Sequence, residues 1–290
     1  MKKIIVIIVA LIFTFTINSC DDKDDFAKEP MLIIKFKFDN NQARLDNFGN
    51  PSIVPFGNAA QSPIFNTISS HFIELSPNAT TPFMSGQILY HGEETVEGGE
   101  TAIDFNKAKI VGQDEIFLQI PLKDIAVGNY EYIRSSLSYQ NYKISVRHMG
   151  TSYVGTLASF VGFNTYIGVD SIGNATFPIN GNKPQGYWEF ALTNNPYSSS
   201  GQAPTHATTV PNPINSTSPT PLGSCVVTGK FESPLEITGL EKRDITMTLS
   251  LSINKSFEWK EVTGDGKYEP SIGENVIDMG LRGLIPTYIK

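Results

Sequence analysis

The segment Ile245–Asn254 alternates apolar and polar residues without exception, and its apolar residues occupy the odd positions. Successive side chains of a β-strand point to opposite faces of a sheet, so this period of two predicts a strand with one buried face. The same alternation recurs in residues 34–38, in residues 142–147 and around Trp188 and Phe190, with Gly, Pro, Asn and Asp in the intervals. These patterns predict an all-β fold, specifically an antiparallel β-sandwich-like domain.

The predicted domain spans residues 31–290 and contains one long segment of different composition. Residues 194–221 are rich in Pro, Ser, Thr, Asn and Ala and contain hardly any large apolar residue. Such a composition is typical of a surface loop or of a linker between domains. Because residues 222–290 are few for an independent sandwich, one domain with a long loop is favoured over two domains.

The N-terminus has the pattern of an export signal. Lys2 and Lys3 precede an apolar run from Ile4 to Ile17, which is too short to span a bilayer as a helix. We therefore expect residues 1–19 to be a signal peptide and the rest of the chain to be exported.

A short motif follows this apolar run. Ile17-Asn18-Ser19-Cys20 resembles the bacterial lipobox, in which signal peptidase cuts before the cysteine. The resemblance implies that the Cys20 thiol carries a diacylglycerol, and that acyl chains such as palmitate anchor the protein in a membrane. Two or three such chains would hold the protein almost permanently. The alternative is that Cys20 is an ordinary residue of an uncleaved membrane anchor.

Residues 20–30 form an acidic segment that begins at this cysteine. Asp21, Asp22, Asp24 and Asp25 resemble the export tag that sends lipoproteins of certain Gram-negative bacteria to the outer face of the outer membrane. The segment holds too little apolar surface to fold by itself, so we expect a flexible tether with a reach of roughly 20 Å. The resemblance implies a lipid-anchored protein exposed at the cell surface.

Charge and cysteine content exclude several classes of partner and site. The chain has 22 Lys and Arg against 29 Asp and Glu, a net charge of −7 at pH 7, and no basic cluster longer than Lys242-Arg243. An acidic surface repels phosphate backbones, so nucleic acid is not expected as a partner, and membrane contact is expected through the lipid alone. With Cys20 lipidated, neither a disulfide framework nor a Cys-type zinc site is expected, and Cys225 is predicted to be a buried, inert residue of a strand.

Sequence motifs of catalysis are mostly absent. The chain contains no Gly-x-Ser-x-Gly, His-Glu-x-x-His, Walker loop, Gly-x-Gly-x-x-Gly or Cys-x-x-Cys. The paired carboxylates of a glycosidase leave no sequence spacing by which they could be recognised. The four histidines, His71, His91, His148 and His206, are far apart in sequence, and His148 is expected to be a structural residue of its strand. The acidic stretch from His91 to Glu100 is interpreted as a solvated loop, with a cation site as the alternative. We expect no catalytic role.

One local segment, from Glu261 to Glu274, has the residue types of an ion site. It resembles the calcium loops of EF-hand and dockerin type, which surround the ion with oxygens at alternate positions and place Gly at the sixth. The resemblance implies as ligands Glu261, Thr263, Asp265, the Lys267 carbonyl and Glu274, with Gly266 at the turn. The alternative is a Gly-Asp-Gly hairpin turn without an ion, following a strand that contains Phe257 and Trp259.

Two further residues are candidates for contact with sugars. Asp170-Ser171-Ile172 resembles the sites at which some of these bacteria O-glycosylate exported proteins, which implies a glycan on Ser171. On the strand around Trp188, the alternation predicts that Trp188 is a core residue and that Tyr187 lies on the opposite, exposed face, where its ring could stack on a sugar. Ordinary core packing of these rings is the alternative.

These features favour a non-catalytic cell-surface lipoprotein that acts as a binding or cell-envelope structural module, with a glycan or an envelope protein as partner. One alternative is a carbohydrate-binding or glycoside-cleaving lipoprotein of nutrient uptake, which would need an aromatic-lined groove. Another is a fimbrial or adhesin-type subunit, which would need an exposed sheet edge that accepts a strand from a neighbour.

Overall fold

The computed structural model describes residues 29–46, 50–204, 225–281 and 283–290 of the protein. This part of the chain consists of eighteen β-strands and three short 3-10 helices, without an α-helix, so the predicted all-β class is confirmed. None of its helices is long and apolar enough to cross a membrane. The predicted signal peptide, Cys20, the four aspartates and most of the segment 194–221 lie outside the described residues.

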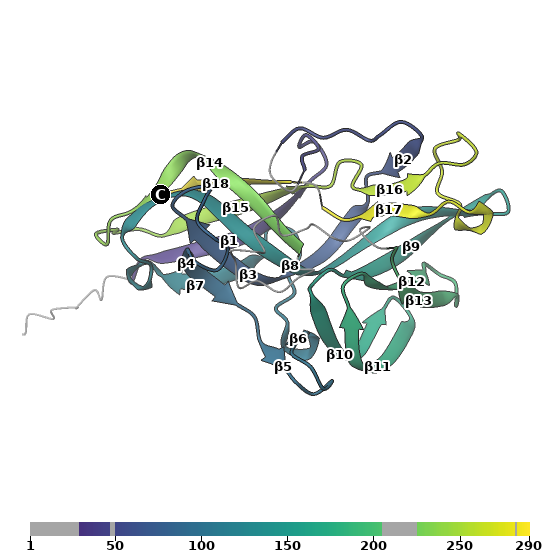
Figure 1. The fold of residues 1–290 in the computed structure, drawn as a ribbon, viewed down its shortest axis with the longest axis horizontal. Coiled ribbons are helices and arrows are strands. Elements are labelled where there is room, and N and C mark those ends of the chain that lie inside the picture. The colour runs from purple at the N-terminus through teal and green to yellow at the C-terminus, as the bar shows by residue number, and fades with distance from the viewer. Residues whose placement is uncertain (1–28, 47–49, 205–224, 282) are drawn as a thin grey trace, which may run out of the picture.

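The strands form four sheets (Figure 1). The first contains, in spatial order, β18 (Leu284–Ile289), β15 (Ile245–Ser252), β1 (Met31–Asp39) and β7 (Ile116–Pro121). The central sheet contains β13 (Ser198–Gln202), β12 (Tyr187–Leu192), β9 (Thr151–Phe160), β8 (Gly128–His148), β3 (Ile64–Ser76) and β4 (Gln87–His91), with β14 (Cys225–Ile237) also paired to β8. The third contains β11 (Ala175–Pro184), β10 (Asn164–Ile172), β6 (Ala102–Asp104) and β5 (Glu94–Thr95), and the fourth β17 (Val276–Met279), β16 (Phe257–Lys260) and β2 (Asn58–Gln61). The 3-10 helices are η1 (Phe105–Lys107), η2 (Leu122–Asp124) and η3 (Pro270–Ile272).

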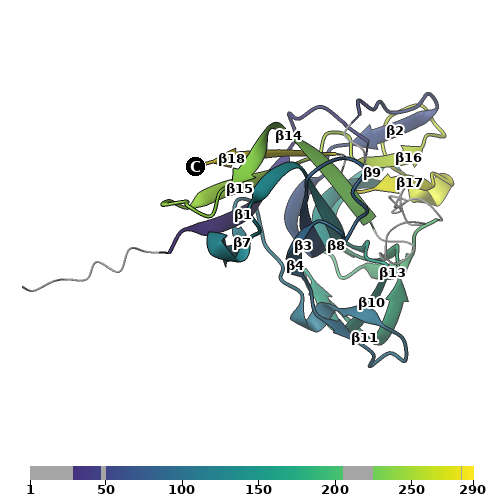
Figure 2. The same cartoon turned by 60° about the vertical axis from the view of Figure 1, so that its left-hand side comes forward.

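The central sheet connects the other three. Its longest strand, β8, has 21 residues and pairs with β3, β9 and β14 along its length. The sheet of β1 and β15 lies at one end of the molecule and the sheet of β16 and β17 at the other (Figure 1). The sheet of β10 and β11 packs on a third side, as the turned view also shows (Figure 2). Each packing contact buries its own apolar cluster, so the protein has several adjoining cores.

The alternating segment at Ile245 forms β15, as predicted, and the odd residues of this strand are at most 1% exposed. Its other face is covered in part, because Gln42 accepts hydrogen bonds from the hydroxyls of Ser250 and Ser252. β15 pairs with β1 in parallel, and β10 pairs with β6 in parallel, whereas the other strand pairs are antiparallel. Strands from distant parts of the chain need no hairpin, so they can pair in either direction.

The segment 194–221 differs from the expected loop, because its first part contains strand β13 on the edge of the central sheet. Backbone hydrogen bonds to β12 hold this strand, so it needs no apolar side chains. The strands after the segment return to strands before it: β14 pairs with β8, β15 with β1 and β16 with β2. Cys225 at the start of β14 is buried, as predicted.

Candidate functional site

A cavity of about 680 Å³ lies between the β12–β13 edge of the central sheet and the sheet of β16 and β17. This volume is in the range of small-molecule binding sites. One wall comes from β8, β9, β12 and β13, and the other from β16, β17 and the segment between them. Its aromatic side chains are Tyr153, Trp188, Phe190, Tyr197, Phe257 and Tyr268.

Strand periodicity places two of these rings side by side. Trp188 and Phe190 are two residues apart on β12, so both point to the face that lines the cavity. Glycines on the neighbouring strands leave room for them. A Cβ on Gly155 of β9 would overlap the Phe190 ring, and a Cβ on Gly201 of β13 would lie 2.7 Å from the Trp188 ring. The sequence therefore shapes this wall through the pairing of large rings with glycines.

Polar side chains surround the aromatic wall. They are Arg147, His148, Asn195, Ser199, Gln202, Glu274 and Asn275. Arg147 is held in place by ion pairs with Asp265 and with Glu269, the latter at 3.7 Å. Glu274 is the only acidic residue among the described lining residues, so no pair of carboxylates meets across this cavity. The arrangement suits a ligand that has apolar faces and hydroxyl groups.

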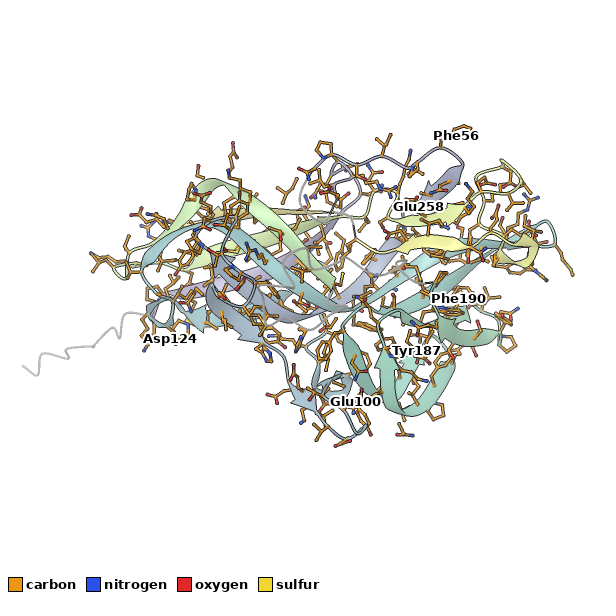
Figure 3. The ribbon with its side chains drawn as sticks, viewed as in Figure 1. Phe56, Glu100, Asp124, Tyr187, Phe190 and Glu258 are labelled. Atoms are coloured by element: carbon orange, nitrogen blue, oxygen red, sulfur yellow. The ribbon has the colours of Figure 1, made fainter. Side chains whose placement is uncertain are left out.

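The prediction for Tyr187 was wrong, because this residue is only 6% exposed. The face of β12 that carries Tyr187 is covered by the sheet of β10 and β11, and Figure 3 shows Tyr187 beside these strands. Trp188, the expected core residue, is half-buried and lines the cavity. One face of β12 thus packs on a second sheet and the other borders the cavity, and alternation alone does not tell which face is which.

Beside Tyr187 the structure brings together two carboxyl groups, those of Glu189 and Asp170. Glu189 is fully buried and accepts a hydrogen bond of 3.2 Å from the Tyr187 hydroxyl. Burial raises the pKa of Glu189 to about 8, and the nearby Asp170 carboxyl adds to this effect. Glu189 has no exposed surface and belongs to the core, whereas Asp170 is partly exposed.

The carboxylates of the predicted calcium loop already have partners, which are backbone amides and, for Asp265, also the Arg147 side chain, while Glu261 and Glu274 lie against each other. Glu274 accepts hydrogen bonds from the amides of Val262 and Glu269, at 3.2 and 2.6 Å, and Glu261 accepts one from Gly264 at 2.9 Å. Asp265 accepts the amide hydrogen of Lys267 at 2.9 Å, and Thr263 donates its hydroxyl to Glu261. Gly266 has a φ of +67°, which fits the expected tight turn. Calcium binding at this loop stays a prediction.

Ser171 lies exposed on β10, where a glycan would have room, and its glycosylation also stays a prediction.

The four histidines lie in different surroundings. His148 is exposed at the end of β8, where the strand extends beyond its core, and borders the cavity. His206 lies outside the described residues. The two remaining histidines, His71 and His91, come together with Glu94.

Comparisons with protein-family models, with curated proteins and with solved structures find no match for this chain. The cavity was missed in the sequence because its walls come from strands more than one hundred residues apart, β8 and β17 among them. A partial signal was present in the aromatic pair Trp188/Phe190, which is spaced by two on a strand.

Proposed function

We propose that the protein is a non-catalytic, lipid-anchored lipoprotein of the cell surface whose domain binds a glycan in the cavity beside Trp188. The observation that carries this proposal is the aromatic wall of the cavity with its polar surround. The lipobox resemblance at Cys20 and the acidic residues after it supply the anchor and the location.

Aromatic rings suit the apolar faces of sugar rings, and hydrogen-bonding side chains suit their hydroxyls. Trp188 is half-buried, while Tyr153 and Tyr197 at the same cavity are 37% and 56% exposed. These rings are therefore accessible from solvent. Asn195, Ser199 and Gln202 on the same side supply donors and acceptors.

The binding proposal is tested with a panel of neutral and acidic oligosaccharides and the purified full-length chain in detergent. Isothermal titration should detect at least one saturable ligand for the wild type. Trp188→Ala should weaken its binding by at least about tenfold, since truncation of a tryptophan that anchors a ligand typically costs more than about 1 kcal/mol. Phe56→Ala is the control, because Phe56 is fully exposed and projects away from the cavity (Figure 3). Equal affinities in both variants would place the ligand elsewhere.

The anchor is tested in cells with a fatty-acid analogue and with external protease. Wild-type protein should take up the label and be cleaved on intact cells, whereas Cys20→Ala should stay unlabelled. Label on Cys20→Ala would contradict lipidation at this residue. Protection of the wild type on intact cells would contradict surface exposure.

A further inference from the structure

We propose that His71, His91 and Glu94 form a binding site for a divalent transition-metal ion such as Zn²⁺. This goes beyond the proposed function, because none of the three residues lines the cavity beside Trp188. The site lies at the junction of the central sheet with β5.

Strand pairing brings the three residues together from two separate segments. His91 at the end of β4 pairs with Phe72 of β3, so it lies next to His71, and the two imidazole ring centres are 4.8 Å apart. The amide of Gly92 donates a hydrogen bond of 2.7 Å to the carbonyl of His71, and the chain then turns so that Glu94 faces both rings. The backbone therefore fixes the relative position of the ligands.

The distances between the ligand atoms fit one shared ion. Nε2 of His71 is 3.1 Å from Oε1 of Glu94, Nε2 of His91 is 3.9 Å from the same oxygen, and the ligand atoms of the group all lie within 4.8 Å. Zn²⁺ binds imidazole nitrogens and carboxylate oxygens at about 2.0 to 2.2 Å, so two ligands of one ion lie roughly 3 to 3.5 Å apart. The Glu94–His71 pair already has this spacing, and a shift of the 42% exposed His91 side chain by less than 1 Å would bring its Nε2 to the same distance from Glu94.

A second observation points to a missing partner at this place. His71 is only 6% exposed, and its Nε2 atom is buried without a hydrogen bond of acceptable geometry to any described residue. This atom nevertheless faces Glu94 at 3.1 Å, and the Phe163 ring packs against the imidazole. A buried nitrogen that makes no hydrogen bond costs stability, and a metal ion between Nε2 and the Glu94 carboxylate oxygen would bind both atoms.

The ligand types select the class of metal. Two imidazoles and one carboxylate suit Zn²⁺ and its neighbours in the first transition row, whereas Ca²⁺ and Mg²⁺ prefer sets of oxygen ligands. The Glu94 side chain is 32% exposed and that of His91 is 42% exposed, so water would complete the coordination on the open side.

Metal titration of the purified full-length chain tests the proposal after removal of bound metal with a chelator. Co²⁺ serves as the visible probe, and Zn²⁺ is then added to displace it. We expect saturation at one ion per chain, with the dissociation constant raised at least about tenfold in both His91→Ala and Glu94→Gln. His148→Ala and Glu93→Gln are matched controls, because they remove an exposed histidine and a neighbouring acid outside the group, and they should bind like the wild type.

His91→Ala and Glu94→Gln alter exposed side chains, and the folding of these two variants is checked by thermal melting in the presence of chelator. The proposal is overturned if the wild type shows no saturable binding of Co²⁺ or Zn²⁺. It is also overturned if His91→Ala and Glu94→Gln bind as tightly as the two controls, because the ion would then be held by other surface groups.

Discussion

The ring of Phe190 on β12 lies directly over Gly155 on β9, in the space that a side chain at position 155 would occupy. The two residues thus form one unit of the cavity wall, in which the glycine provides space and the phenylalanine provides surface. An alanine at position 155 would overlap the ring and force Phe190 to move.

We therefore expect Gly155→Ala to destabilise the domain by about 1 to 3 kcal/mol, the usual cost of overpacking, and to weaken glycan binding at the same time. Thermal melting and titration measure the two effects. Gly181→Ala on β11 is the matched control, because a Cβ there meets no atom closer than 3.8 Å, and it should leave both quantities nearly unchanged. Wild-type behaviour of Gly155→Ala would mean that the Phe190 ring is not confined by this wall.

Arg134 on β8 and Glu74 on β3 form a buried ion pair at 3.1 Å, with side chains 4% and 0% exposed. Arg134 also donates to the carbonyl of Thr81 at 2.6 Å. Removal of one partner leaves a buried charge without compensation, so Arg134→Met should cost about 3 to 5 kcal/mol and lower the melting temperature by roughly 6 to 20 °C. In contrast, Lys37→Met breaks an exposed ion pair with Asp39 and should have little effect. Similar melting of the two variants would show that the buried pair does not stabilise the fold.

The buried carboxyl of Glu189 predicts a pH dependence of stability. Its pKa is raised to about 8 in the folded protein from an ordinary value of 4.5, first by burial and then by Asp170. Between these two pH values the folded chain holds a proton that the unfolded chain has lost, so the free energy of unfolding falls as the pH rises and levels off above pH 8. Glu189→Gln should remove this contribution, which amounts to about one proton per molecule.

Urea unfolding of the wild type and Glu189→Gln at pH 6.5, 7.5 and 8.5 measures this dependence. The wild type should lose more stability than the variant across this range. Parallel pH profiles would show that Glu189 ionises in the folded protein as it does in water.

Calcium tests the loop from Glu261 to Glu274. A calcium ion in this loop would have to replace hydrogen bonds that the carboxylates now accept from backbone amides. We therefore expect a weak site, and a gain in melting temperature of only about 2 °C at millimolar calcium. The gain should be smaller in Asp265→Ala. Identical melting of the wild type in calcium and in chelator would leave the loop as a hairpin turn.

Secondary structure was predictable wherever one face of a strand meets a core. The alternation in residues 245–254 identified β15, and that in residues 142–147 identified the end of β8. The Ser-rich strand β13 was missed, because backbone pairing at a sheet edge leaves no apolar pattern.

The sites depended on strand register, which local patterns do not contain. His71 and His91 are twenty positions apart, and only the pairing of β3 with β4 brings them together. Tyr187 and Trp188 were assigned to the wrong surroundings because the sequence shows that they lie on opposite faces of β12 but not which sheet covers each face.

The central claim, that the cavity beside Trp188 is the binding site, is tested most directly by tryptophan fluorescence. The chain has two tryptophans: Trp188 lines the cavity, and Trp259 is 1% exposed in the core behind it. Addition of the oligosaccharide that binds best should produce a saturable change in emission of the wild type, and Trp188→Phe, which keeps an aromatic ring, should lose most of that change while still binding. An equal change in Trp188→Phe, or no change with any oligosaccharide, would contradict the account.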